Sequence, residues 1–147
     1  MTIGLACSDG GHLTSMCELM EAFGERDIFL ITYEGIRKPS GFHRVYYIRR
    51  MYNNPFKFIV GSLQILRVLI CERPSMSIST GSEVAIPFML FSKLLGSKTV
   101  YVESVARISV LSRAGLLLYG KVDYFLVQWP ELLKKYGSKA EYRGRLL

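Results

Sequence analysis

The chain has 147 residues, 50% of them hydrophobic, and a mean hydropathy of +0.22, which suits one domain with a proper core and argues against two. Its 19 Lys and Arg outnumber 12 Asp and Glu, and the formal charge of +7 favours an anionic partner such as phosphate, nucleic acid or an acidic membrane surface. The three cysteines lack the spacing of metal ligands, so we expect no metal site and a reducing, cytoplasmic compartment.

Short apolar or β-branched runs, bounded by glycine, proline, serine or a charge, predict six strands. They are Thr2–Cys7, Ile28–Thr32, Val45–Ile48, Met76–Ser79, Thr99–Val102 and Phe125–Val127. Helices are predicted over Leu13–Phe23, Pro55–Glu72 and Val84–Leu95, then one beginning around Ser109, and a last short one opened by Pro130. Because strands and helices alternate, we expect an α/β fold: a Rossmann-like, doubly wound parallel sheet in a single domain over residues 1–147.

The first predicted loop places two glycines and a histidine between a strand and a helix. In a doubly wound sheet, ligands bind beyond the carboxyl ends of the strands, where helix N-termini present free N–H groups. Gly10 and Gly11 would let the backbone approach an anion closely, and His12 is placed to donate to a phosphate or to take a proton. Ser15 and Glu18 have capping-box spacing for this helix. The alternative is that the two glycines form a tight turn and nothing more.

A second loop of the same form follows the fourth predicted strand. Thr80, Gly81 and Ser82 offer hydroxyls, a glycine and another helix N-terminus at the same sheet edge, although an ordinary helix cap is the alternative. Two such loops together suggest a ligand that carries a pyrophosphate. The sequence has no GxGxxG, no Walker motif and no Cys/His cluster, so a dinucleotide oxidoreductase, a P-loop NTPase and a zinc enzyme are disfavoured, and we expect no cofactor.

The most specific patterns are ESVAR (103–107) and VQWPE (127–131), together with GGHLTSM (10–16) and STGSEVAIPF (79–88). In these motifs the chain resembles the membrane-anchoring subunits of the two-chain UDP-N-acetylglucosamine transferase of asparagine-linked glycan assembly, and their prokaryotic relatives in capsule and exopolysaccharide synthesis. More distantly, the glycine loop is similar to the amino-terminal half of the peptidoglycan transferase that forms lipid II.

The resemblance implies the acceptor-side, amino-terminal half of a GT-B glycosyltransferase. A second glycosyltransferase chain would carry most of the UDP-sugar site, and the acceptor would be a saccharide on a lipid pyrophosphate. The sugar would be GlcNAc, and nucleic acid would not be a partner. This assignment agrees with phosphate-binding loops on a basic chain.

Eukaryotic members of that family begin with a hydrophobic anchor, whereas this sequence starts directly at the strand Thr2–Cys7. We therefore expect peripheral attachment to an anionic membrane surface, at its cytoplasmic face. Two stretches mix apolar and basic residues, Pro55–Ile70 and Arg107–Lys121. We favour an ordinary core helix for the first and a membrane interface for the second.

Further site residues lie in and after the two specific motifs. Glu103, at the end of a strand, would bind an acceptor hydroxyl or act as general base, or else pair with Arg107 to fix the loop. Arg107 is also a candidate acceptor-phosphate ligand. Trp129 is either a buried anchor or part of the interface with the second chain. For the tail, Arg143, Leu146 and Leu147 are expected to dock on that chain.

Three hypotheses follow for the function. The chain is the acceptor-binding half of a two-chain UDP-sugar transferase, in which His12 and Glu103 shape the catalytic site. Alternatively it is a scaffold that recruits and enhances a catalytic partner without contributing chemistry. The third possibility is an independent nucleotide- or phosphate-binding protein of Rossmann type.

Overall fold

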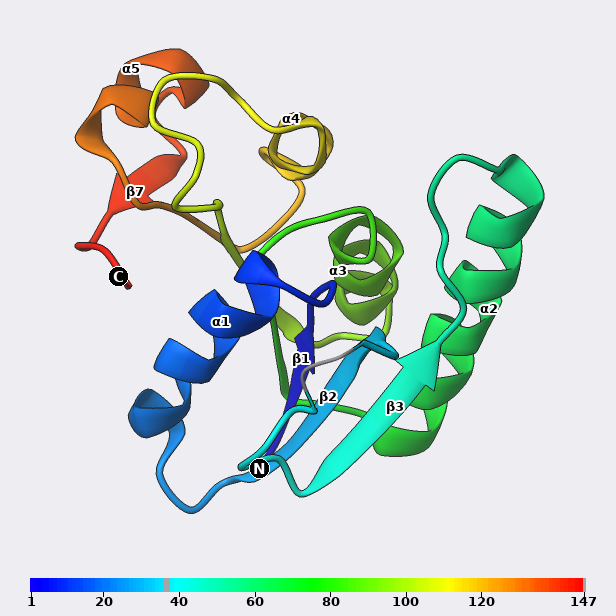
Figure 1. The fold of residues 1–147 in the computed structure, drawn as a ribbon. Helices are drawn as coiled ribbons and strands as arrows, with labels where there is room; N and C mark the ends of the chain where they lie inside the picture. Colours follow the sequence, from blue (N-terminus) through cyan, green and yellow to red (C-terminus); the bar gives the residue numbers. More distant parts are fainter. Residues whose placement is uncertain (36–37, 147) are drawn as a thin grey trace.

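The computed structural model describes residues 1–35 and 38–146, whose strands form one parallel sheet (Figure 1). Its strands are β1 (Thr2–Ala6), β2 (Asp27–Tyr33), β3 (Arg44–Ile48), β4 (Met76–Ser79), β5 (Lys98–Val102), β6 (Tyr124–Val127) and β7 (Ala140–Tyr142). Their order is β3-β2-β1-β4-β5-β6-β7, so the chain first builds outward from β1 in one direction and then crosses to build in the other. The reversal falls between the neighbours β1 and β4, and a sheet of this kind binds ligands beyond the carboxyl ends of such a strand pair.

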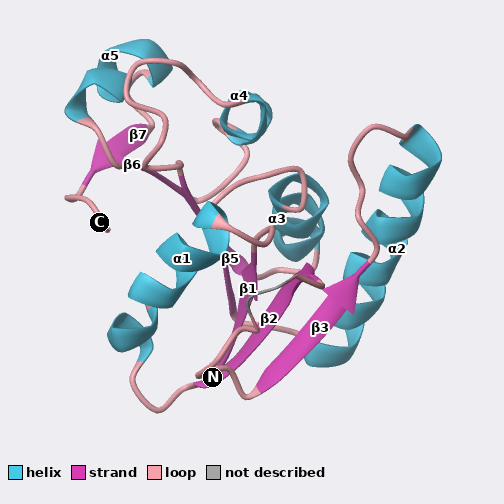
Figure 2. Cartoon of the chain, in the orientation of Figure 1, coloured by secondary structure: helices cyan, strands magenta, loops and turns pink. Residues whose placement is uncertain are grey.

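The connections between the strands are mostly helical (Figure 2). They are α1 (Gly11–Glu18), the 3-10 turn η1 (Met20–Phe23), α2 (Pro55–Glu72), α3 (Ala85–Leu94), α4 (Arg113–Leu118), η2 (Pro130–Leu132) and α5 (Leu133–Tyr136). The longest, α2, has a well-defined start. The Asn54 side chain accepts hydrogen bonds from the N–H groups of Phe56 and Lys57, and Pro55 occupies the first helical position, where its missing N–H costs nothing.

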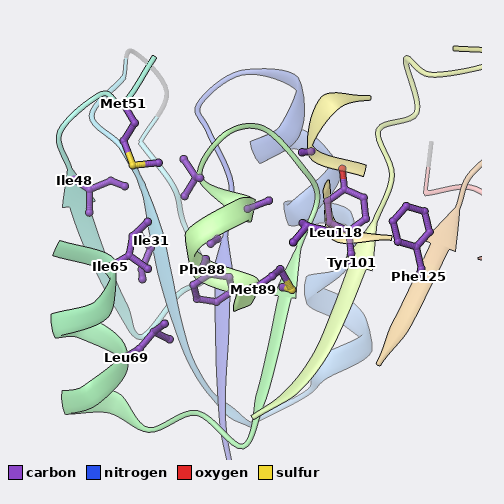
Figure 3. Packing of buried hydrophobic residues seen from close by; sticks show 14 of the residues in the cluster. Ile31, Ile48, Met51, Ile65, Leu69, Phe88, Met89, Tyr101, Leu118 and Phe125 are labelled. Atoms are coloured by element: carbon purple, nitrogen blue, oxygen red, sulfur yellow. The ribbon is translucent and has the colours of Figure 1, made fainter. Parts of the chain in front are cut away.

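Helices cover both faces of the sheet, and neighbouring residues of β2 point to opposite layers. Leu30 packs with Leu13 of α1 on one face. On the other face, Ile31 belongs to a larger core with Ile65 of α2 and Phe88 of α3 (Figure 3). Because β2 is buried on both sides, its sequence is continuously apolar from Ile28 to Ile31, as expected for a central parallel strand. The predicted Rossmann-like parallel fold is confirmed.

The sequence-based elements need three corrections. The strand β7 at the sheet edge was not predicted. The first helix ends at Glu18 and continues only as the turn η1. The helix expected around Ser109 begins at Arg113, because the Ser112 hydroxyl caps it by accepting from the Gly115 N–H over 2.8 Å.

The proposed capping box of α1 is also wrong. Gly10, with φ of 85°, turns the chain into the helix at once, and no side chain caps it. Ser15 consequently lies within the helix and is buried, while Glu18 is its last residue.

Candidate functional site

The loops after β1 and β4 are tied together by two hydrogen bonds between His12 and Thr80. Nδ1 of His12 lies 2.8 Å from the Thr80 carbonyl oxygen, and the Thr80 hydroxyl donates to the His12 carbonyl oxygen over 2.8 Å. Since a carbonyl oxygen only accepts, Nδ1 carries a hydrogen, so in the neutral form of the ring Nε2 is the acceptor. The two loops therefore do meet at one sheet edge, as predicted.

A cavity of about 760 Å³ opens beside this pair at the carboxyl edge of the sheet. Four side chains singled out from the sequence line it: His12, Ser82, Glu103 and Arg107. They come from the start of α1, which follows β1, and from the loops after β4 and β5, so the parallel sheet gathers residues that are up to 95 positions apart in the chain. The cavity is large enough for a small polar ligand such as a sugar with its phosphate.

The remaining predicted phosphate-binding residues, Gly10, Gly11, Thr80 and Gly81, lie in the same two loops but do not contribute to the cavity wall among the described residues. Gly10 is exposed and has the positive φ, whereas a Cβ on exposed Gly11 would meet no atom within 4 Å. Gly11 therefore leaves its backbone open to approach from solvent. Phosphate binding by these residues stays a prediction.

Ser82 occupies a strained backbone position in the cavity wall. Its φ is 71°, a left-handed conformation that residues with a side chain rarely adopt. Its hydroxyl accepts a hydrogen bond of 3.4 Å from the Val84 N–H. This contact resembles the predicted cap, but the helix α3 begins later, at Ala85.

Glu103 lies at the back of the cavity, with 0% of its surface exposed. Oε1 accepts hydrogen bonds from the Ser104 N–H at 2.8 Å and the Tyr101 hydroxyl at 3.3 Å. Oε2 accepts from the Ser112 hydroxyl at 2.8 Å and from the Tyr136 hydroxyl. Burial, followed by the nearby Glu103 charge, raises the pKa of Tyr101 well above its ordinary value, so this phenol stays a donor. Within the described residues, Glu103 forms no ion pair with Arg107.

The loop that follows Glu103 is held by the second specific motif. The Gln128 side chain donates to the Glu103 carbonyl oxygen over 3.0 Å, and the Trp129 indole donates to the Val105 carbonyl oxygen over 2.6 Å. The two motifs ESVAR and VQWPE are therefore partners within one chain. Trp129 anchors this loop while remaining half-buried; its place in an interface with a second chain stays a prediction.

Glu83 also lines the cavity, although the sequence analysis did not single it out. It is half-buried, and its Oε1 accepts a 2.7 Å hydrogen bond from the Tyr33 hydroxyl. Burial, and secondarily this hydrogen bond, raise the pKa of Tyr33, which keeps the phenol protonated. The hydrogen bond from Tyr33 orients the Glu83 carboxylate, and the described residues provide no hydrogen bond to its other oxygen. Glu83 follows Ser82 directly, so its place after β4 was a signal that could have identified it.

The mouth of the cavity also carries residues that the sequence analysis missed. Tyr52 and Asn53 line it from the loop after β3, and Arg113 lines it from the first position of α4. Arg107 and Arg113 are both exposed. The entrance is therefore cationic, while two carboxylates lie inside it.

The carboxy-terminal tail folds back on its own chain. Leu146 packs against the core on the α1 side, and its N–H donates to Gln128 Oε1 over 2.9 Å. The Arg145 guanidinium lies 4.5 Å from the centre of the Trp129 ring. Arg143 is exposed and pairs with Glu141 at 2.7 Å, and Leu147 lies outside the described residues. Docking of this tail on a second chain stays a prediction.

Within residues 1–35 and 38–146, no three His, Cys, Asp or Glu side chains gather closely enough to hold a metal ion. The same residues include no helix with the length and apolarity needed to cross a membrane.

Comparison with known proteins identifies the family of the chain. Residues 41–146 match the profile of the family described as "Oligosaccharide biosynthesis protein Alg14 like". The chain belongs to the Alg14-like family. It is 36% identical over 107 residues to the UDP-N-acetylglucosamine transferase subunit ALG14 of Candida albicans, a match that covers 69% of this chain and 47% of that protein. The chain spans less than half the length of the first curated Alg14 relatives that it matches.

Solved glycosyltransferases share the fold of this Alg14-like chain. MurG of Acinetobacter baumannii superposes on 88% of it with a TM-score of 0.68 and 15% identity. A glycosyltransferase from Rickettsia africae covers 98% of it with a TM-score of 0.71 and 14% identity. The match spans 41% and 42% of those larger chains, as expected for one Rossmann-like half of a GT-B enzyme.

Proposed function

We propose that this Alg14-like chain is a single-domain, acceptor-side half of a two-chain glycosyltransferase. It binds a saccharide linked to a lipid pyrophosphate and works peripherally at the cytoplasmic face of a membrane. A second chain, which holds UDP-GlcNAc, supplies the sugar. Membership of a family whose curated relatives are named as UDP-N-acetylglucosamine transferase subunits supports the reaction class.

The observation that carries the proposal is the cavity at the switch between β1 and β4. It combines an imidazole with a free Nε2, a carboxylate and a cationic entrance. Arg107 and Arg113 at this entrance suit the pyrophosphate, because guanidinium groups bind phosphate oxygens with paired, charge-assisted hydrogen bonds. The saccharide would then extend inward toward His12.

His12 is the general base in this proposal. The acceptor hydroxyl oxygen forms a bond to the anomeric carbon of the sugar while the bond from that carbon to the UDP oxygen breaks. The hydroxyl proton passes to Nε2 of His12, and the Thr80 carbonyl holds the opposite nitrogen, so that the ring is oriented for this transfer.

Glu83, rather than Glu103, is the carboxylate that contacts the acceptor. The Tyr33 hydroxyl fixes one oxygen of Glu83, and its other oxygen can accept a hydrogen bond from a sugar hydroxyl. Glu103 already accepts four hydrogen bonds, two on each oxygen, which favours a role in fixing the loop through these bonds instead of through the predicted pair with Arg107.

The decisive experiment measures sugar transfer from radiolabelled UDP-GlcNAc to a short-chain polyprenyl-pyrophosphoryl-GlcNAc, with the chain alone and with a second chain that carries the nucleotide-sugar half. We expect transfer only with both chains, because donor and acceptor meet in the cleft between the two halves. Robust turnover by the isolated chain would instead support an independent enzyme.

A second candidate function is a scaffold that recruits and enhances the catalytic chain. The complete hydrogen bonding of Glu103 favours it, since the most specific motif then serves loop structure. His12→Ala and Glu83→Gln in the assembled complex separate the two functions. Full activity of both variants would favour the scaffold, whereas lost turnover with an intact complex supports the acceptor-binding half.

A further inference from the structure

The helix α2 is apolar on two faces, although only one of them packs on the sheet. Ile65 and Leu69 face the core and are buried. On the outer side, Phe56 is 73% exposed, Ile59 55% and Leu63 59%. These three residues are spaced by three and four positions, so they form one stripe along the first two turns of the helix. Single exposed apolar residues are ordinary, but a continuous stripe marks a surface that something covers.

The stripe borders an apolar groove between α2 and α3, which lie side by side in the layer (Figure 1). The groove has a volume of about 340 Å³, and its walls include Ile59 and Leu63 from α2 and Ile86 and Leu90 from α3. Its one hydroxyl, on Ser62, donates back to the Phe58 carbonyl oxygen over 2.7 Å. The groove therefore offers no free polar group to a polar ligand and suits hydrocarbon.

Cationic side chains gather at the amino-terminal end of the same stripe. Arg49, Arg50 and Lys57 line a hollow of about 270 Å³ with Phe56. Arg50 is paired with Asp9 at 2.8 Å, whereas the side chains of Arg49 and Lys57 form no ion pair within the described residues. The only carboxylate in α2, Glu72, lies at the opposite end of the helix and binds Arg44.

This face also adjoins the candidate site. Ile86 belongs both to the apolar groove and to the wall of the large cavity. Tyr52 and Asn53, which precede α2, line the mouth of that cavity. A flat partner seated on α2 would thus lie next to the entrance of the candidate site.

We propose that the outer stripe of α2, with the α2–α3 groove and the cations Arg49 and Lys57, is a docking surface for an anionic lipid bilayer. Phe56, Ile59 and Leu63 enter the boundary between headgroups and acyl chains, and the two cations contact lipid phosphates. This location differs from our sequence-based preference for Arg107–Lys121, where Ile108, Val110, Leu116 and Leu117 are also exposed and a membrane interface stays a prediction. It deepens the proposed function by naming the membrane-facing surface, but its test does not depend on sugar transfer.

The test is sedimentation of the chain with vesicles of pure phosphatidylcholine and of phosphatidylcholine with phosphatidylglycerol. The pair Phe56→Ser with Ile59→Ser should lower partitioning into the anionic vesicles at least tenfold. Arg49→Gln with Lys57→Gln should lower it by about 30-fold on anionic vesicles and by little on neutral ones, since each basic side chain contributes separately. All four side chains face solvent or line an open hollow, so the variants should keep the fold, which circular dichroism checks.

Leu94→Ser is the matched control, because Leu94 is also apolar and 81% exposed but lies at the far end of α3. It should leave vesicle binding unchanged. An equal loss of vesicle binding in Leu94→Ser would overturn the proposal. A loss of vesicle binding confined to Leu116→Ser with Leu117→Ser on α4 would also overturn it. The proposal would also be overturned if Phe56→Ser with Ile59→Ser left vesicle binding unchanged and instead weakened a self-association or the complex with the second chain. Vesicle binding with no sugar transfer by the two-chain complex would contradict the proposed function alone and leave this surface supported.

Discussion

A Cβ atom added to Gly81 would lie 2.9 Å from Cε1 of His12. The glycine therefore lets the loop after β4 lie against the imidazole, and its φ of 115° is one that a residue with a side chain rarely adopts. Together with the hydrogen bonds between His12 and Thr80, this contact leaves the ring little freedom at the edge of the cavity.

Gly81→Ala should therefore displace His12 and lower the turnover of the two-chain complex by about tenfold or more, because small shifts of a catalytic group are costly. Gly96→Ala is the control: Gly96 also has a positive φ, 85°, but a Cβ there would meet nothing within 4 Å. Both variants should lose stability through backbone strain, by about 1–3 kcal/mol. Denaturant unfolding measures that loss, and equal activity in the two variants would contradict the role of the contact.

His12→Ala should lower turnover at saturating acceptor by about 10²–10⁴-fold if the imidazole takes the proton. If it only binds phosphate, acceptor binding should instead weaken by about 1.5–3 kcal/mol with turnover little changed. Thr80→Val is the companion variant, since it removes the hydroxyl bond to the His12 backbone but keeps the carbonyl that holds Nδ1. Steady-state kinetics on the complex separates the two outcomes. Full activity of His12→Ala would mean that the GGH sequence is only a turn.

Glu103→Gln should destabilise the chain by about 1–3 kcal/mol, because an amide NH₂ would face hydroxyl and N–H donors that now bond to a carboxylate. Glu131→Gln, at an exposed site, should change the free energy of unfolding by less than about 0.5 kcal/mol. Chemical denaturation provides the measurement. A fully stable Glu103→Gln variant with lost turnover would restore Glu103 as a catalytic candidate.

Local patterns predicted the fold well where the physical cause is local. The bounds of α2 were predicted because Pro55 marks its start and an apolar run follows, and the structure adds the Asn54 cap. The strand β7 was missed because Ala140–Tyr142 is three residues long at a sheet edge and carries no apolar run. The lining of the cavity was predicted in part, since the rule for carboxyl ends of parallel strands identified His12, Ser82, Glu103 and Arg107, whose roles stay predictions.

What the sequence could not resolve is which residues meet across long separations. The Tyr136 hydroxyl donates a hydrogen bond to Glu103 from 33 positions away in the chain, and no spacing rule predicts that contact. Without it, the carboxylate looked equally suited to chemistry and to structure. The outer face of α2 posed a similar problem. A helix whose sequence is apolar on two faces is predicted to be a core helix, and only the structure shows that its outer face is exposed.

Stability should fall in acid through Asp123. The Lys93 ammonium, followed by the Thr99 N–H, lowers the pKa of Asp123 to about 2. A carboxyl group whose folded pKa lies below its unfolded value stabilises the fold above the unfolded value, near 3.9, and loses that contribution as the pH falls through the folded value. Asp123→Asn should thus lower Tm above pH 5, and its deficit should shrink between pH 4 and pH 2. A constant deficit over that window would contradict the ion-pair origin.

Two substitutions in the carboxy-terminal tail can separate its role in the fold of this chain from docking on a second chain. Leu146→Ala removes a side chain that packs on the α1 side of the core, so it should lower the free energy of unfolding by about 1 kcal/mol even without a partner. Arg143→Gln removes an exposed cation that pairs with Glu141, and it should leave the isolated chain within about 0.5 kcal/mol of the original stability. If the tail docks on the second chain, Arg143→Gln should nevertheless weaken the complex in a titration calorimetry experiment. Unchanged affinity in Arg143→Gln and in a chain truncated after Tyr142 would assign the tail to the fold of this chain alone.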